Sequence, residues 1–460
     1  MSSLWEFLSG SETVASIQRC FGVEFVTSSE VMCRSTSDEE VDSNGVSDIK
    51  NAVKCTEHMT FGQSGNGRDT FSLSASSPVR NCNNGFVKME YRIKDTIATS
   101  TIASTVRSRS TVQHNGRAGK GIILNSVSNT TYCPHNDRST DYVIHNKFWY
   151  YIFLFGAMLG NEIFYMAFFP FCCWNVSVWV TRRVAIIWAI VMYFGQAAKD
   201  IVKWPRPSSP PVVKLEHIYN MEYGMPSTHA MMGLSLPFTL FLLTVQRFEY
   251  PYYLGVAIAV TWCTLVCISR LYLGMHNVLD VIAGLVLAAV LMAVIYPYLD
   301  VIEDIFINGK YGATLAFGIG ISMAIFYPTF NKWTMSRGEA TLLLGIGTGT
   351  LVGLWFKVHF NLPPFEPVGD SPYTITVPDL RWMFFMILKM SSGILILLAT
   401  RFVISASIKK VAYAILRILP LNEKRNEQVY VEVPRKFFTY MAIAVLTASI
   451  IPYMHQCIGL

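Results

Sequence analysis

Apolar runs of roughly 20 residues follow one another through the last two thirds of the chain. We place them near residues 148–170, 183–203, 229–246, 252–273, 277–298, 311–330, 340–358, 382–404 and 437–455. Each run has about the length of an α-helix that crosses the ~30 Å hydrocarbon core of a bilayer. Adjacent prolines, as at Pro210-Pro211 and Pro363-Pro364, mark loops between the runs. The sequence therefore predicts an all-α, polytopic membrane bundle of about 8–10 transmembrane helices.

Composition supports this prediction and excludes other classes of protein. Hydrophobic residues make up 52% of the 460 residues and charged residues only 15%, whereas soluble domains carry about 25% charged residues. A cytosolic enzyme or a secreted disulfide scaffold is therefore not expected, and the ten cysteines are scattered. The net charge is +6, and the sequence contains no block of like charges. It suits an anionic substrate or the lipid bilayer surface and does not indicate nucleic-acid binding.

The chain divides near Asn146. Residues 1–145 form a polar, largely disordered tail, residues 146–300 hold the catalytic motifs described below, and residues 301–460 add further transmembrane helices. The start of the tail has apolar residues at roughly helical spacing, namely Leu4, Trp5, Phe7, Leu8, Val14, Ile17 and Phe21. This short amphipathic segment either lies on a membrane or a partner or is a solvent-exposed helix. We expect no signal peptide, because the start lacks a basic region followed by a long apolar stretch.

Two charges, Glu162 and Lys389, lie inside apolar runs. A charge at such a position must be paired or face a polar cavity. Structural pairing is the favoured interpretation for both, and a direct role is the alternative.

Two polar clusters flank the loop between the second and third apolar runs. Lys199 and Arg206 follow the second run, where cations either hold a phosphate or anchor a helix end in lipid head groups. The sequence Pro-Ser-Thr-His at 226–229 opens the third run, and unpaired backbone N–H groups at a helix start suit an oxyanion. Ser227 could equally be an ordinary N-cap. His229 is costly in an apolar helix unless it meets water or a partner.

A third cluster joins the fourth and fifth runs. On one continuous helix Arg270 and His276 would be rotated by about 240° from each other. They converge only if the helix breaks, and Gly274 is the expected C-terminal cap. His276 and Asp280 lie four residues apart and share a face of the next helix. A carboxylate that accepts a hydrogen bond from one ring nitrogen leaves the other nitrogen aimed and more nucleophilic.

Topology brings the three clusters to one membrane face. Two runs separate His229 from Arg270, so the chain returns to the same side, and the first two clusters share a loop. The residues that converge there are Lys199, Arg206, Ser227, His229, Arg270, His276 and Asp280. Three cations, two histidines, a hydroxyl and an aspartate are the parts of a metal-independent phosphoryl-transfer site. The sequence offers no carboxylate cluster for magnesium or calcium, so we expect no metal and no other cofactor.

These spacings resemble the signature of the type 2 phosphatidic acid phosphatase superfamily, which includes lipid phosphate phosphatases and haloperoxidases. That signature is Lys, six residues, Arg-Pro; then Pro-Ser-Gly-His; then Ser-Arg, five residues, His, three residues, Asp. Its first and third parts are unbroken here, and the second has Thr228 in place of Gly. The stretches AKDIVKWPRPSSPPVVKLE and EYGMPSTHAM are similar to the sphingosine 1-phosphate phosphatases, a branch that also carries Thr at this position.

The resemblance implies a phosphatidic acid phosphatase type 2/haloperoxidase-like core in a multi-pass protein of the endoplasmic reticulum membrane. It implies an enzyme that dephosphorylates sphingosine 1-phosphate and related sphingoid base phosphates without a metal. His276 would be the nucleophile that forms a phosphohistidine, Asp280 would orient it, and His229 would be the proton donor. The substrate phosphate would be bound by Lys199, Arg206, Ser227, Thr228 and Arg270, the backbone N–H of Thr228 being available and its methyl group narrowing the pocket.

Other functions are compatible with these residues. Phosphatidic acid or glucose 6-phosphate could be the substrate, and the chain could instead be a non-catalytic scaffold or transporter; a haloperoxidase would be water-soluble. Orientation is also open, because Lys and Arg between 409 and 436 favour a cytosolic site whereas the resemblance implies a lumenal one. The possible glycosylation acceptors Asn175-Val176-Ser177 and Asn129-Thr130-Thr131 are expected on opposite sides.

Overall fold

The computed structural model describes residues 2–25, 142–216, 222–329, 332–362, 372–374, 379–418 and 427–459. Most of the predicted polar tail, including the acceptor at Asn129, lies outside these residues. Residues 1–38 and 137–460 belong to one compact unit, and the description below concerns that unit.

The described chain is almost entirely helical. Its first helices are α1 (Ser2–Ser9), α2 (Ser11–Cys20), α4 (Lys147–Met158), α5 (Glu162–Asn175), α6 (Val178–Val202), α7 (Thr228–Thr244), α8 (Tyr252–Tyr272) and α9 (Val278–Ile295). They are followed by η1 (Tyr296–Tyr298), α10 (Leu299–Glu303), η2 (Asp304–Asn308), α11 (Gly312–Ile325), α12 (Met335–His359), α13 (Leu380–Ile418), α14 (Glu427–Val445), η4 (Leu446–Ile450) and α15 (Ile451–Ile458). Two small ladders complete it: β1 (Val23–Phe25) antiparallel to β2 (Tyr142–Ile144), and β3 (Phe248–Glu249) parallel to β4 (Tyr373–Thr374).

Six helical segments within the described residues are long and apolar enough to cross a membrane, judged by length and composition. They are Val178–Val202, Tyr252–Tyr272, Val278–Asn308, Met335–His359, Leu380–Arg417 and Gln428–Ile458. The bent pair α4 and α5 would make a seventh, and α7 and α11 are shorter apolar helices. Together these elements correspond to the nine predicted apolar runs. The prediction of an all-α, multi-pass membrane protein is confirmed.

The first predicted run, 148–170, is not one helix. It is broken between Met158 and Glu162, and α4 and α5 meet at an angle of 61°. Asn161 begins the second segment, because its side chain accepts a hydrogen bond from the Glu162 backbone N–H at 2.8 Å. Gly160 and Asn161 at the break are half-buried, Glu162 is exposed, and all three line a cavity that is described below.

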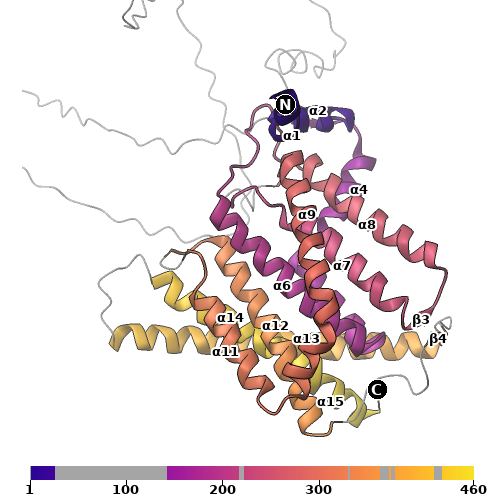
Figure 1. Cartoon of the computed structure of the whole chain (residues 1–460), viewed down its shortest axis with the longest axis vertical. Helices are drawn as coiled ribbons and strands as arrows, with labels where there is room; N and C mark the ends of the chain where they lie inside the picture. Colours follow the sequence, from indigo (N-terminus) through magenta and orange to yellow (C-terminus); the bar gives the residue numbers. More distant parts are fainter. Residues whose placement is uncertain are drawn as a thin grey trace, which may run out of the picture. The chain divides into compact units, whose positions relative to one another are not determined.

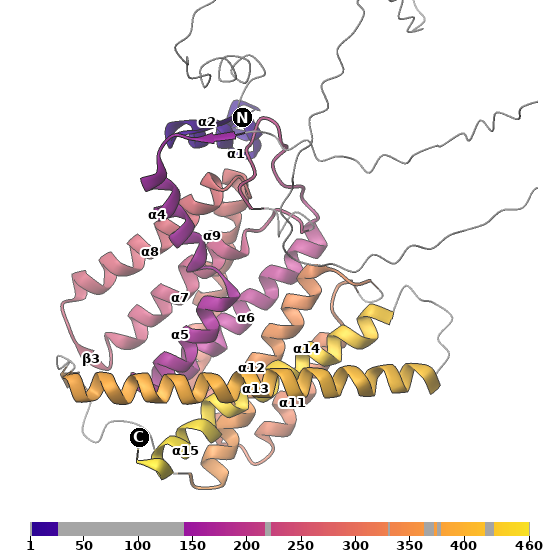
Figure 2. The ribbon, with the colours of Figure 1, turned by 180° about the vertical axis from the view of Figure 1, so that it is seen from behind.

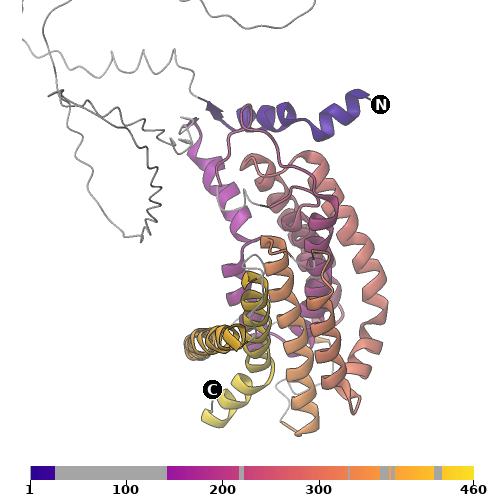
Figure 3. The same cartoon turned by 90° about the vertical axis from the view of Figure 1, so that its left-hand side faces the viewer.

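Helix α6 is at the centre of the bundle, and α13 is outside it. In the most apolar stretch of each helix, 72% of α6 but only 11% of α13 is buried within the protein. The centre is filled by Ile187, Val191, Met231 and Leu236, all fully buried. Helix α13 packs on α14 and α5 and crosses the other helices steeply in Figures 1 and 2; Figure 3 shows it nearly end-on.

Helices α12 and α14 approach closely along a line of glycines. A Cβ atom at Gly345 would lie 2.5 Å from the carbonyl oxygen of Phe437, and one at Gly349 would lie 2.2 Å from that of Met441. Gly353 continues the line one turn later. Small residues four apart allow such backbone contact between transmembrane helices. This contact joins the last helices of the chain to α12, which itself packs on α6.

The predicted amphipathic segment forms α1 and α2 and packs on the chain's own helices (Figure 1). Val14, Ala15 and Gln18 of α2 are buried, whereas Leu4 and Trp5 of α1 are more than half exposed. The segment is therefore neither a freely exposed helix nor part of a disordered tail. It covers the end of the bundle at which α8 turns into α9 (Figure 2).

Candidate active site

A polar cavity of about 120 Å³ lies between the broken helix, the end of α6 and the starts of α7 and α9. Six of the eight predicted site residues line it: Lys199, Arg206, Thr228, His229, Arg270 and His276. The cavity also has the lining residues Gly160, Asn161, Glu162, Tyr165, Trp188, Met192, Glu222, Glu339, Leu342 and Leu343. The predicted convergence of the three polar clusters is thus present in the structure.

The turn between α8 and α9 aims two of these side chains into the cavity. Helix α8 ends at Tyr272, and Gly274 has a left-handed φ of 70°, which favours glycine. A Cβ at Gly274 would lie 2.3 Å from the Val213 carbonyl oxygen, so space also requires glycine here. The chain reverses at this cap, and Arg270 and His276, six residues apart, line the same cavity as the spacing predicted.

His276 lies against Asp280 at the start of α9. Its Nδ1 is 3.5 Å from Asp280 Oδ2, which also accepts a hydrogen bond from the Asn277 backbone N–H at 2.9 Å. Asp280 itself is fully buried and does not line the cavity. The other ring nitrogen, Nε2, lies 3.4 Å from Arg206 Nη1. The carboxylate is thus behind the imidazole, and Nε2 is the nitrogen on the side of the cations.

Burial and nearby positive charge keep His276 neutral. Burial is the main cause that lowers the pKa of His276 well below its usual 6.5, and Arg206, Arg270 and Lys199 lower it further. A neutral imidazole has a lone pair with which to attack phosphorus.

The three cations are held by carboxylates and carbonyl oxygens around the cavity. Lys199 Nζ donates to Glu222 Oε2 at 2.8 Å, and Arg206 donates from Nε to the Glu222 carbonyl oxygen at 2.9 Å. Burial alone would raise the pKa of Glu222, but Lys199 and Arg206 hold it below its ordinary value. The Glu222 carboxylate is therefore an anion that is already paired.

Arg270 has spare donors. Its Nη2 donates to Glu216 Oε2 at 2.6 Å, but Nε and Nη1 are buried and have no hydrogen-bond partner among the described residues. A buried guanidinium with unpaired donors is costly unless an anion completes it. The residue therefore fits an incoming phosphate.

Ser227 is placed differently from the other candidates. Its hydroxyl accepts a hydrogen bond from the Ala230 backbone N–H at 3.4 Å, and its own N–H donates to the Asp280 carbonyl oxygen at 3.0 Å. It is fully buried and is not among the residues that line the cavity. These contacts match the N-cap interpretation, and Ser227 joins the start of α7 to α9.

His229 reaches the cavity beside the break between α4 and α5. A Cβ at Gly160 would lie 2.3 Å from His229 Cδ2. The imidazole therefore occupies the space that any larger residue at position 160 would need. Thr228 and His229 come from α7, and the nucleophile candidate comes from the start of α9, so the two histidines approach the cavity from different helices.

Comparison with known proteins agrees with this geometry. Residues 180–302, which include all eight predicted site residues, match the PAP2 superfamily. The chain is 38% identical over 321 residues to human sphingosine-1-phosphate phosphatase 2, a match that covers 69% of this chain and 80% of the relative. The chain belongs to the sphingosine-1-phosphate phosphatase family. It is 39% identical over 318 residues to rat sphingosine-1-phosphate phosphatase 1, covering 68% of this chain and 73% of the relative.

More distant members share less of the chain. Lipid phosphate phosphatase delta of Arabidopsis thaliana is 30% identical over 220 residues, which is 44% of this chain and 52% of that protein. No solved protein structure matches this chain. The family resemblance inferred from the three motifs is confirmed, and the protein is an integral membrane phosphatase.

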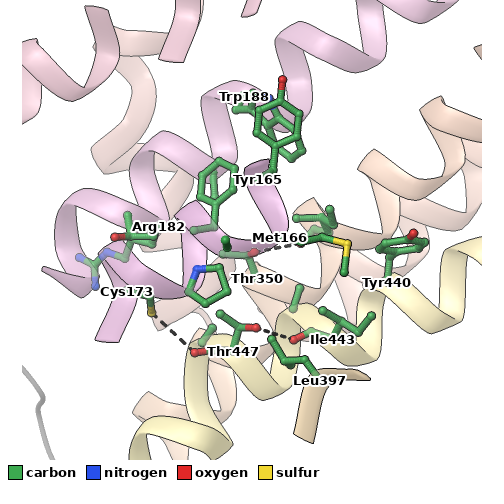
Figure 4. Close-up of a pocket in the computed structure, with 18 of the residues that line it drawn as sticks. Tyr165, Met166, Cys173, Arg182, Trp188, Thr350, Leu397, Tyr440, Ile443 and Thr447 are labelled. Atoms are coloured by element: carbon green, nitrogen blue, oxygen red, sulfur yellow. Dashed lines mark hydrogen bonds between the residues drawn. The ribbon is translucent and has the colours of Figure 1, made fainter. Parts of the chain in front are cut away.

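A second, apolar cavity of about 290 Å³ adjoins the polar one in this member of the sphingosine-1-phosphate phosphatase family (Figure 4). Glu162, Tyr165, Trp188 and Leu342 line both cavities. Figure 4 shows Trp188 toward one end of the apolar cavity and Cys173 and Thr447 toward the other. Its walls come from α5, α6, α12, α13 and α14.

The three motifs did not reveal several residues of the polar cavity. Glu222 pairs with two of the cations, Glu339 comes from α12, and Gly160 makes room for His229. Glu222 was visible as a carboxylate just before the second motif, but nothing in the spacing connected it to Lys199. Glu162, for which the sequence favours structural pairing over a direct role, accepts a hydrogen bond from the Tyr440 hydroxyl and lines both cavities.

Proposed function

We propose that this protein hydrolyses sphingosine 1-phosphate and related sphingoid base phosphates to the free base and phosphate. One observation carries the proposal: five predicted residues, Lys199, Arg206, His229, Arg270 and His276, line a single cavity that adjoins an apolar one. The named activity of the relatives supports the same substrate class.

The proposed reaction has two steps. His276 Nε2 attacks phosphorus, the bond between phosphorus and the ester oxygen breaks, and His229 gives a proton to the departing alkoxide. His229 then takes a proton from water, which attacks the phosphohistidine and releases inorganic phosphate and free His276. Asp280, 3.5 Å from Nδ1, stabilises the imidazole in the required orientation. Lys199, Arg206 and Arg270 stabilise charge on the phosphoryl oxygens, and Thr228 lines the same pocket.

We also propose that three segments of the chain have different roles. Residues 146–300 supply the eight site residues, while residues 301–460 close the cavities through Glu339 and Leu342 of α12 and Tyr440 of α14. Residues 1–145 contribute α1 and α2, which pack over the turn that carries His276.

The experiment that tests the activity offers purified protein three substrates in EDTA: sphingosine 1-phosphate, phosphatidic acid and glucose 6-phosphate. We expect phosphate release that is fastest from sphingosine 1-phosphate and is lost in His276→Ala. Faster phosphate release from either of the other two substrates would identify that phosphate monoester as the preferred substrate instead. An unchanged cellular effect of His276→Ala would favour the scaffold or transporter instead.

We place the protein in the endoplasmic reticulum membrane with the site facing the lumen, as its family resemblance implies. Asn175 lies at the end of α6 opposite to Lys199, because it precedes the first residue of this 25-residue helix. A lumenal site would therefore leave Asn175 in the cytosol, where it receives no glycan. Glycosidase treatment of wild type and Asn175→Gln should reveal no glycan on Asn175, and a glycan there would reverse this orientation.

A further inference from the structure

Glu162 occupies the junction between the polar and the apolar cavity. Four residues line both cavities, and Glu162 is the charged one among them. The Tyr440 hydroxyl donates to Glu162 Oε1 at 2.5 Å, and the carboxylate forms no ion pair among the described residues. A carboxylate is thus fixed at the place where an anion-binding cavity opens into an apolar one.

A carboxylate at this position disfavours a substrate that carries negative charge alone. The polar cavity is built for an anion: Arg270 is only 1% exposed, and its Nε and Nη1 have no hydrogen-bond partner among the described residues. Glu222 does not weaken this site, because Lys199 and Arg206 already pair with it. Among the described residues Glu162 forms no ion pair, and the charge of Lys436 acts on it only from beyond ion-pair distance. Its carboxylate therefore disfavours a phosphate dianion in the adjoining cavity. The arrangement becomes favourable when the ligand carries a positive charge next to its phosphate.

The order of the lining matches the order of groups in a sphingoid base phosphate. In such a lipid the phosphate is on the first carbon, an ammonium is on the second, and the alkyl chain continues from the third. In the protein the cations line the polar cavity, Glu162 lines both cavities, and the apolar cavity adjoins it. The lining of α5 from Glu162 to Cys173 covers eleven residue steps, about 16 Å of helix at 1.5 Å per residue. That length holds a substantial part of a long alkyl chain.

We propose that Glu162 binds the substrate ammonium, oriented by Tyr440, and that the apolar cavity between α5, α6, α12, α13 and α14 holds the alkyl chain. This inference rests on the proposed function. In this proposal Glu162 makes the enzyme prefer phosphate monoesters that carry an ammonium group over those that lack this positive charge.

The test compares two substrates that differ at the amine, which is a charged ammonium in one and a neutral acetamide in the other; comparing their ratio across variants separates the effect of Glu162 from that of the added acetyl group. Dihydrosphingosine 1-phosphate and its N-acetyl derivative have the same phosphate and the same chain, but the amide nitrogen is neutral. The ratio of their kcat/KM values is measured in mixed micelles for wild type, Glu162→Gln and Glu162→Asp. Glu432→Gln is the matched control, because this carboxylate is on the same helix as Tyr440 and lines neither cavity.

We expect the wild-type preference for the free amine to fall about 10- to 100-fold in Glu162→Gln, the range for a hydrogen bond to a charged group. Glu162→Asp should recover part of it, and Glu432→Gln should keep all of it. Equal loss on both substrates, or an unchanged ratio, would overturn the role of Glu162 and leave the proposed function intact. If wild type released no phosphate from the free-amine substrate, the proposed function itself would fail.

Discussion

Arg270 shows how a single residue can be prepared for a ligand. Its side chain is 1% exposed, against 2% for Lys199 and 6% for Arg206, and two of its nitrogens have no partner among the described residues. Leaving such donors unpaired costs on the order of 1–3 kcal/mol. The Glu216 bond and the surrounding fold hold the guanidinium in place despite this cost. Phosphate binding would recover it, so the site is organised before the substrate arrives.

Replacing Arg270 by Lys should therefore impair catalysis although the charge is kept. A single ammonium cannot provide the planar set of donors that a guanidinium offers to a phosphoryl group. We expect kcat/KM for sphingosine 1-phosphate to fall by about 100-fold or more, the loss typical of a transition-state donor. Arg435→Lys is the control, since Arg435 pairs with Glu432 and lines neither cavity. An Arg270→Lys enzyme within threefold of wild type would contradict the role of the guanidinium.

His276 should make the protein less stable in mild acid. Its pKa in the folded protein is well below 6.5 because of burial and the neighbouring cations, so below pH 6.5 the unfolded chain binds a proton that the folded chain does not. Stability is therefore retained above this pH and lost as pH falls toward the folded pKa, at up to ~1.4 kcal/mol per pH unit. Melting temperatures in detergent at pH 7.5 and 5.5 should differ more for wild type than for His276→Gln. Equal differences would show that His276 is not held neutral.

At the scale of elements, the break between α4 and α5 is as important as the motifs. It brings Gly160 against His229 and places Glu162 where the two cavities meet. The apolar run 148–170 gave little sign of it, because Gly160 and Asn161 are compatible with a continuous transmembrane helix. Tertiary contacts accompany the break: His229 fills the space beside Gly160, and Tyr440 of α14 donates a hydrogen bond to Glu162.

Gly160→Ala should reduce activity by displacing His229. The added methyl would lie 2.3 Å from the imidazole, so the ring or the helix must move, and small displacements of a catalytic group can cost about 100-fold in rate. Gly318→Ala in α11 is a matched control, because a Cβ there meets nothing within 4 Å. Turnover is measured for both variants. Wild-type turnover in Gly160→Ala would mean that His229 tolerates the shift or is not needed.

Helix α2 lies outside the motifs and supports the turn that carries His276, the proposed nucleophile. Gln18 Nε2 donates to the carbonyl oxygens of Val213, at 2.6 Å, and Tyr272, at 2.8 Å, and Gln18 Oε1 accepts from the Val213 N–H at 3.0 Å. The amide thus clamps the loop that follows Arg206 to the end of α8. Its position next to Gly274 connects it to the turn that presents His276.

Gln18→Ala should lower kcat about tenfold or more with a smaller change in KM, because it loosens the turn and leaves two buried carbonyl groups and one N–H unpaired. The melting temperature should also fall. Gln246→Ala is the control; Gln246 donates to the Tyr296 hydroxyl at an exposed site. If Gln18→Ala lowered stability but left kcat unchanged, α2 would be a structural cover without influence on the site.

At the scale of the whole molecule, the sequence predicts the membrane class, the helix positions and the converging motif residues well. It predicts less well the residues that surround those motifs in the cavity. The spacings of the motif residues, together with α-helix geometry and the capped turn at Gly274, are enough to predict that these residues lie close together. Glu222, Glu339 and Gln18 have no such periodicity, since their roles depend on how loops and distant helices fold back on the core. Ser227 illustrates the same limit, because sequence allowed both an N-cap and a phosphate ligand, and the contacts around it are those of an N-cap.

The central claim is that the converged residues form a phosphatase that acts through His276. The most direct measurement is a rapid acid-free quench of wild-type protein mixed with sphingosine 1-phosphate that carries ³²P, followed by recovery of labelled protein. We predict a label that is stable in base, released in acid, mapped to the peptide containing His276 and absent from His276→Ala. Equal labelling of His276→Ala, or phosphate release by that variant at the wild-type rate, would contradict the account.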